Sequence, residues 1–375
     1  MKLNLLGYSV LLCFDAVAAL YPVNIGQAQL FNNVNHKFTK RNSDQEIKSF
    51  NVTHTCFGDQ CKKVSEAIDK LTNTLSSIIQ VKNQIKIGVA FGSYCERLNL
   101  CNMTDMIRFG YGGPGEYRTI KNKDGKEVSY PIALHKQLVD PSDIDDFMST
   151  IIPDILLSFN SDDKYWFEGD GDIEAGQPDF FIVAAQTLIR GLGLDFTIRG
   201  GGTYEFSLDP KFKNDTKLST YEKIFSPRYE FLLDNVDFDS VASMRFSRYI
   251  LDTLIVTTFD GQSINNLLDP YAEFVFPNHT IPLNELVSYL KKTPLNEASQ
   301  KLGKLFNTPD SLAIKLPSGN LLELETIIKV NETSYNSLYF SESKYLNTKD
   351  ALYTVKVTKS EARLPSEKPE DWPTY

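Results

Sequence analysis

The chain has 375 residues, enough for one large domain or two ordinary ones. Its formal net charge of −9 argues against a nucleic-acid partner, because surfaces that bind nucleic acid are basic. After the first twenty residues, no apolar run is long enough to cross a bilayer, so we expect no transmembrane segment.

Residues 1–19 have the organisation of a signal peptide. Lys2 supplies the positive end, residues 5–14 form an apolar core, and the small residues at 16–19 offer a cleavage site. A buried N-terminal helix is the alternative interpretation. We predict a secreted, extracellular protein, which could also be associated with the cell surface.

Three further segments divide the rest of the chain. Residues 20–55 are polar and weakly patterned, and we predict an N-terminal arm or a short propeptide. Lys40-Arg41 would be the processing site of such a propeptide, although a solvated charge pair in a flexible arm is the simpler interpretation. We predict one domain over residues 56–360 and an extended tail over residues 361–375.

Cysteine usage agrees with secretion. Four cysteines follow the predicted signal peptide, and an even number in an oxidising compartment indicates two disulfides. Their spacing favours the local pairs Cys56–Cys61 and Cys95–Cys101, although three connectivities are possible. A zinc site made of His54, Cys56 and Cys61 is a weaker alternative, because thiolates in a secreted chain usually oxidise.

Sequons for N-linked glycosylation recur along the chain. One sequon alone is a weak signal, but several behind a signal peptide predict a glycoprotein with these stretches at the surface. The sequon asparagines are Asn51, Asn102, Asn214, Asn278 and Asn331.

The first predicted elements are a helix and a strand. Apolar residues at helical spacing predict a helix over residues 62–80, and alternating apolar residues predict a strand over residues 84–94. The glycine-rich residues 109–117, FGYGGPGEY, are predicted to form a loop. A short helix begins at Tyr130, and an apolar run over residues 155–159 predicts a buried strand.

An acidic loop and an apolar helix follow this strand. Residues 161–177 are rich in Asp and Gly. We interpret Asp170, Asp172 and Glu174 as an acidic turn. A calcium loop is the weaker alternative, because the segment lacks the glutamate that would close such a loop. Asp179 is predicted to cap the helix, and Gly191 and Gly193 to end it.

A polar stripe lies within this apolar helix. Gln186 and Arg190 are four residues apart and therefore share a face, with Thr187 beside them. The same three residues could simply form the solvent side of an amphipathic helix.

The segments around this stripe resemble a family of secreted, mostly fungal, zinc metallopeptidases that carry an HExxHGLGF helix. The matching segments are the lead-in Phe159-Asn160-Ser161 and Trp166-Phe167, and the glycine end Gly191-Leu192-Gly193. The resemblance implies an α+β fold of the zincin type, in which a central helix packs on a mixed sheet.

The residues expected to touch zinc are different here. Gln186 stands in the place of the first histidine, Thr187 in the place of the glutamate, and Arg190 in the place of the second histidine. An amide oxygen is a poor zinc ligand, a hydroxyl is no general base near neutral pH, and a guanidinium has no lone pair to give. We therefore predict no catalytic residue, no metal ligand and no cofactor.

Two later segments also differ from the relatives. Residues 243–256 are predicted to be helical, and the resemblance places Arg248 where the relatives carry an acidic residue, in an element that ends at Asp252. Residues 331–353 correspond to the segment in which the relatives carry a further histidine, and they contain none.

The sequence therefore predicts a secreted glycoprotein with a metallopeptidase-like fold that is catalytically inactive and acts by binding. Its partner would be an unknown protein or a cell-wall ligand. Two alternatives stay open. One is an active hydrolase with a non-standard site, for example a pair of carboxylates, and the other is a structural protein of the cell wall or surface.

Overall fold

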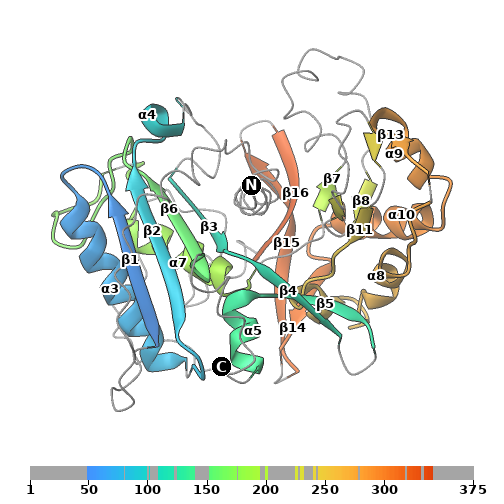
Figure 1. Cartoon of the computed structure of the whole chain (residues 1–375), viewed down its shortest axis with the longest axis horizontal. Helices are drawn as coiled ribbons and strands as arrows, with labels where there is room; N and C mark the ends of the chain where they lie inside the picture. Colours follow the sequence, from blue (N-terminus) through green and yellow to red (C-terminus); the bar gives the residue numbers. More distant parts are fainter. Residues whose placement is uncertain are drawn as a thin grey trace, which may run out of the picture. The chain divides into compact units, whose positions relative to one another are not determined.

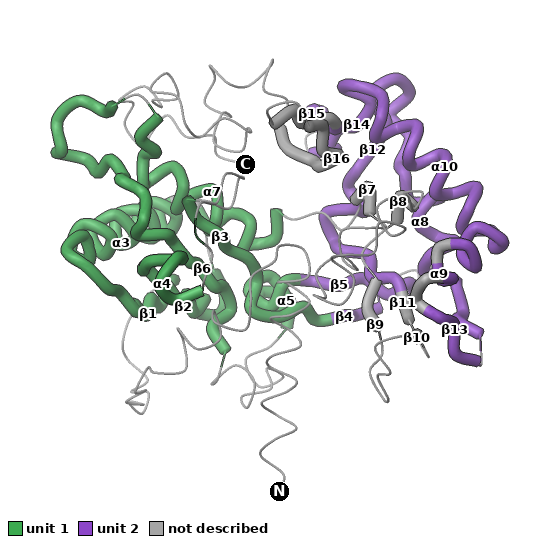
Figure 2. The backbone as a smooth tube through the Cα atoms, turned by 90° about the horizontal axis from the view of Figure 1, so that it is seen from above, with its two compact units in different colours: residues 1–118, 131–194, 344–375 green, residues 119–130, 195–343 purple. Residues whose placement is uncertain are grey.

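A computed structural model describes most of the chain between residues 49 and 340, in two compact units. Unit 1 contains residues 1–118, 131–194 and 344–375, and unit 2 contains residues 119–130 and 195–343 (Figure 2). Helices and strands are mixed in both, which confirms the α+β class. A single domain over residues 56–360 stays a prediction. The described residues are 49–79, 81–98, 101, 109–121, 125–139, 152–174, 176–194, 199–201, 224–226, 229–231, 240–241, 244–277, 279–316, 319–330 and 333–340.

Several predicted features lie outside the described residues. They are the signal peptide, the pair Lys40-Arg41 and the C-terminal tail. Four of the five sequon asparagines lie there as well, namely Asn102, Asn214, Asn278 and Asn331.

Unit 1 is built on a four-stranded sheet in the order β1-β2-β6-β3 (Figure 1). Its strands are β1 (Phe50–Cys56), β2 (Ile85–Gly92), β6 (Ile155–Asn160) and β3 (Gly110–Pro114). The first three run parallel, and β3 pairs with β6 antiparallel. All of β1 except Cys56 belongs to the segment predicted as an N-terminal arm. The helices are α3 (Cys61–Ile78), α4 (Tyr94–Leu98), α5 (Ile132–Leu138) and α7 (Phe180–Leu192).

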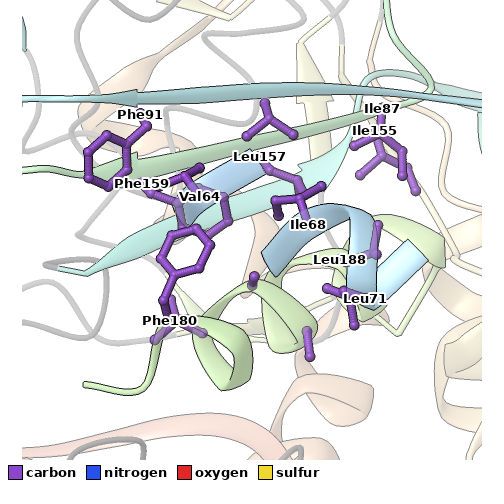
Figure 3. Close-up of a cluster of buried hydrophobic side chains, with 14 of the residues drawn as sticks. Val64, Ile68, Leu71, Ile87, Phe91, Ile155, Leu157, Phe159, Phe180 and Leu188 are labelled. Carbon is purple, nitrogen blue, oxygen red and sulfur yellow. The ribbon is translucent and has the colours of Figure 1, made fainter. Parts of the chain in front are cut away.

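One face of this sheet forms the hydrophobic core with α3 and α7 (Figure 3). The side chains alternate along β2 and β6, so that every second residue points toward the two helices. Burying each of these large apolar side chains stabilises the fold by roughly 1.5–3 kcal/mol. The centre of the core contains Val64, Ile68 and Leu71 from α3, Ile87 and Phe91 from β2, Ile155, Leu157 and Phe159 from β6, and Phe180 and Leu188 from α7.

The prediction of a loop over residues 109–117 was wrong, because this segment contains β3. Its glycines permit close packing. A Cβ atom on Gly110 would lie 2.8 Å from a ring carbon of Phe159, and one on Gly112 would lie 2.8 Å from both Leu157 Cδ2 and Thr187 Cβ. Neither glycine has a positive φ. The absence of side chains therefore lets the edge strand lie directly against α7.

Unit 2 contains a four-stranded antiparallel sheet in the order β12-β14-β15-β16. Its strands are β12 (Ile255–Thr257), β14 (Leu312–Lys315), β15 (Leu321–Val330) and β16 (Thr333–Phe340). The helices α8 (Asn265–Ala272), α9 (Leu283–Leu290) and α10 (Leu295–Phe306) belong to the same unit.

Short strand pairs complete the described part of the chain. β4 (Tyr117–Lys121) pairs with β5 (Glu127–Pro131), and β7 (Arg199–Gly201) pairs with β8 (Ile224–Ser226). β9 (Tyr229–Phe231) pairs with β11 (Met244–Phe246), and β10 (Ser240–Val241) pairs with β13 (Ile281–Pro282).

The prediction of a helix over residues 243–256 was also wrong. The segment contains all of β11, a 3-10 turn over Leu251–Leu254 and the start of β12. Ile255, Val256 and Thr257 are consecutive, β-branched and all buried, which suits a strand covered on both faces more than one side of a helix. Asp252 is fully buried and accepts a hydrogen bond from the backbone N–H of Tyr249 at 3.0 Å.

Two disulfides lie in unit 1. Cys56 is joined to Cys61, which links the end of β1 to the start of α3, and Cys95 is joined to Cys101. These are the local pairs that the spacing favours. None of the helices in the described ranges has the length and apolar character needed to cross a membrane.

Candidate functional site

The ends of α7 are set by two residues. Asp179 Oδ1 accepts hydrogen bonds from the N–H groups of Phe181 at 2.8 Å and Ile182 at 3.4 Å, which confirms the predicted N-cap. Gly193, with a φ of 124°, ends the helix. Gly191 does not end it, because it lies inside the helix. A Cβ atom there would lie 2.2 Å from Ile155 Cγ2, so this glycine lets α7 pack against β6.

The lead-in residues of the resemblance hold the start of α7 in place. The N–H of Trp166 donates to Pro178 O at 2.9 Å, and the N–H of Phe180 donates to Trp166 O at 3.0 Å. The rings of Phe167 and Phe180 stack with centroids 5.0 Å apart. Within the strand segment, Asn160 Oδ1 accepts a hydrogen bond from the N–H of Tyr94 at 3.0 Å. These residues therefore have structural roles that do not depend on a metal.

The acidic turn before α7 is held by lysines. Asp170 pairs with Lys63 on α3, and it also accepts a hydrogen bond from the N–H of Phe167 at 3.2 Å. The hydrogen bond from Lys63 is the main reason that the pKa of Asp170 lies below its ordinary value. Glu174 pairs with Lys164 at 2.8 Å. Two of the three acidic side chains are thus engaged in ion pairs.

Thr187 is buried, with 8 % of its surface exposed. Its hydroxyl donates within the helix to Val183 O at 3.0 Å or Ala184 O at 2.9 Å. The side chain faces β3, where a Cβ atom on Gly112 would lie only 2.8 Å from Thr187 Cβ. Thr187 is therefore not on a solvent side of the helix, and the backbone of β3 fills the space that a longer side chain would need.

Gln186 and Arg190 are half-buried, and each has an interaction partner. They lie one helical turn apart and share a face, as the spacing predicts. Thr187 is offset from Gln186 by about 100° around the helix axis. The polar stripe therefore divides into a buried residue against the sheet and two half-buried residues on a different side of α7.

The three motif positions do not fit a catalytic zinc. They offer a neutral amide, a hydroxyl that is committed to the helix backbone and a permanently charged guanidinium. Within the described ranges, no three His, Cys, Asp or Glu side chains gather closely enough to hold a metal ion.

The three described histidines lie apart in the sequence. His54 is on β1, His135 is on α5, and His279 is exposed between α8 and β13. Burial lowers the pKa of His54 although Asp69 opposes the shift, and burial together with Arg118 lowers the pKa of His135. The alternative zinc site of His54, Cys56 and Cys61 is contradicted, because the disulfide leaves neither cysteine a thiolate.

A buried ion pair in unit 1 was not predicted. Lys136 on α5 lies 2.7 Å from Asp154, and the side chains are 4 % and 1 % exposed. The other oxygen of Asp154 accepts a hydrogen bond from the N–H of Lys86 at 2.7 Å. The sequence contains a signal for this pair, because Lys136 lies one turn after Ile132 and Ala133 on the apolar side of α5.

A second charged cluster lies in unit 2. Asp269 on α8 accepts hydrogen bonds from Lys126 and from the buried Arg248, both at 2.7 Å. Burial alone would raise the pKa of Asp269, but the two cations outweigh it and hold the pKa below its ordinary value of 3.8. Arg248, which the resemblance places at an acidic position, thus has a carboxylate partner from a later helix.

Comparison with known protein families gives a match over most of the chain. A family model described as SPBPB7E8-like matches residues 17–365, which include every described residue of both units. No curated protein and no solved structure matches the chain.

Proposed function

The chain belongs to the SPBPB7E8-like family, and we propose that it is a secreted glycoprotein with a metallopeptidase-like fold that acts by binding and has no peptidase activity. The proposal has three parts, which are the scaffold, the loss of catalysis and the location. Each part has its own support.

The support for a zincin-type scaffold is the arrangement of unit 1. The sheet consists of three parallel strands and the antiparallel edge strand β3, and α7 packs against β6 and β3. The lead-in residues Trp166 and Phe167 dock on the start of α7. The resemblance implies a central helix on a mixed sheet, and the packing of α7 on this sheet supports the proposed scaffold.

The main support for the proposed loss of catalysis is the packing of Thr187. A general base in this position would need a carboxylate, free of the helix backbone, beside a bound substrate. Here the hydroxyl donates to the carbonyl groups of Val183 or Ala184, and β3 lies against the side chain. The position is therefore packed as core.

Secretion is supported by the two disulfides, because such bonds persist in oxidising compartments. Asn51, the described sequon asparagine, is exposed on β1. Both features accompany the signal-peptide pattern of residues 1–19.

We propose that Gln186 and Arg190 lie at the surface through which the protein binds its partner, a protein or a cell-wall ligand. We also propose that Arg190 stands where a metal would supply positive charge and pairs with a carboxylate. Replacing Arg190 by leucine should then lower the melting temperature more than replacing it by lysine. Equal melting temperatures for both variants and the wild type would exclude this role.

The peptidase part is tested with the secreted, purified chain on a broad peptide library, with and without a chelator. We expect no cleavage above that of a preparation from untransformed host cells. Cleavage that a chelator abolishes would contradict the proposal. Cleavage that survives chelation would favour an active hydrolase of another class.

A further inference from the structure

β1 is the terminal strand of the sheet in unit 1 (Figure 1). Within the described ranges it pairs on one side only, with β2, and the register is continuous from Phe50 to Cys56. A long regular edge strand offers its free N–H and C=O groups to a strand of another chain.

The sequence of β1 lacks the side chains and the bulge that usually protect such an edge. Natural edge strands are interrupted by proline, by a bulge or by charged side chains, especially lysine. FNVTHTC has no proline, no lysine and no acidic residue, and its pairing with β2 has no bulge. The strand is also rich in residues that favour β structure.

Asn51 is exposed on this strand, and it begins the sequon Asn51-Val52-Thr53. Because side chains alternate along a strand, Asn51 points to the face opposite Phe50, which is buried in the core. A glycan on Asn51 would therefore leave the core undisturbed and would lie next to the open edge.

The hydrogen bond of Thr53 limits when Asn51 could be modified. In the folded protein, Thr53 Oγ1 donates to Ile87 O on β2 at 3.3 Å. The sequon is thus extended, and its hydroxyl is committed to the neighbouring strand. Recognition of the sequon as an acceptor must precede the pairing of β1 with β2.

We propose that Asn51 carries an N-linked glycan that shields the edge of β1 and keeps copies of the chain apart. The inference rests on the proposed secretion. Asn51 Nδ2 forms a bond to the anomeric carbon of a lipid-pyrophosphate-linked oligosaccharide. The bond from that carbon to the pyrophosphate breaks, the lipid pyrophosphate leaves with the electron pair, and Nδ2 loses one proton.

The test uses the full chain, expressed with its own N-terminus in a eukaryotic secretory host. Peptide mass spectrometry after enzymatic deglycosylation gives the occupancy of each sequon, and size-exclusion chromatography gives the monomer fraction. We expect Asn51 to be occupied, and we expect N51Q to lose its monomer peak to larger species.

Two variants separate edge shielding from other effects of the glycan. N51K has no glycan but places a charge on the edge strand, so it should recover the monomer peak. N102Q removes a different sequon and should stay monomeric.

Three outcomes would overturn the inference. An unmodified Asn51 in a secreted protein whose other sequons are occupied would exclude it and leave secretion intact. An N51Q variant as monomeric as the wild type would exclude the shielding role. If none of the five sequons carries a glycan, the proposed glycoprotein itself fails, and this inference fails with it.

Discussion

Single charged residues hold together parts of the fold that are distant in sequence. Asp154 precedes β6, yet it contacts Lys136 on α5 and the backbone of Lys86 at the start of β2. The side chains of the pair are almost completely buried, so the loss of one partner leaves the other charge without compensation in a medium of low polarity.

We expect K136M to lower the free energy of unfolding by roughly 3–5 kcal/mol, because Asp154 would remain buried and charged. The measurement is urea unfolding followed by circular dichroism, as a double-mutant cycle with D154N. The double variant should lose less stability than the sum of the two single losses. Additive losses would show that the pair is not coupled.

The cluster around Asp269 predicts a dependence of stability on pH. The pKa of this carboxyl is lowered in the folded state from its ordinary value of 3.8. The folded state therefore binds fewer protons than the unfolded state in acid. The stabilising contribution is fully present well above pH 3.8 and is lost as the pH falls below this value toward the folded-state pKa.

We expect D269N to lower the free energy of unfolding at neutral pH by about 2 kcal/mol, because Arg248 loses its carboxylate partner. The loss of stability on acidification should be less steep in this variant than in the wild type. The matched control is E297Q, which removes the exposed partner of Lys301 on α10 and should have no measurable effect at neutral pH. Identical acid profiles for D269N and the wild type would exclude the assigned role.

At the scale of elements, the position of β3 against α7 depends on Gly112. A Cβ atom there would approach Leu157 Cδ2 and Thr187 Cβ to 2.8 Å, whereas one on the neighbouring Gly113 would meet only Tyr111 Oη at 3.7 Å. Neither glycine has a positive φ, so alanine causes no backbone strain at either position. The two sites therefore differ in packing alone.

We expect G112A to lower the free energy of unfolding by roughly 1–3 kcal/mol through overpacking, and G113A to cost clearly less. Chemical unfolding of the two variants side by side gives the comparison. Equal losses would mean that close contact between β3 and α7 does not limit stability.

Local patterns predicted most of the regular elements of unit 1. The helical spacing of apolar residues gave α3, alternation gave β2, and the cap Asp179 gave the start of α7. β3 was not predicted because glycines in a local sequence indicate a turn. Their role in close packing depends on the contact with Thr187, which the sequence does not show. The helix predicted over residues 243–256 failed because the pairing of β12 with β14 is not visible in local sequence.

At the scale of the whole molecule, the candidate site was predicted in part. The residues Gln186 and Arg190 share a side of α7, as their spacing requires, but the burial of Thr187 depends on a strand that was not predicted. The Asp269 cluster joins residues 126, 248 and 269, and such contacts follow from tertiary packing alone. The properties of single residues could therefore be predicted better from the sequence than the contacts between residues that are distant in it.

The proposed function requires that the residues around α7 hold no zinc ion. Native mass spectrometry of the secreted protein, purified in the presence of zinc and then exchanged into metal-free volatile buffer, tests it most directly. We predict the mass of the glycosylated chain with no bound zinc. One zinc ion on each chain, retained until a chelator is added and lost in a variant of Gln186 or Arg190, would contradict the claim.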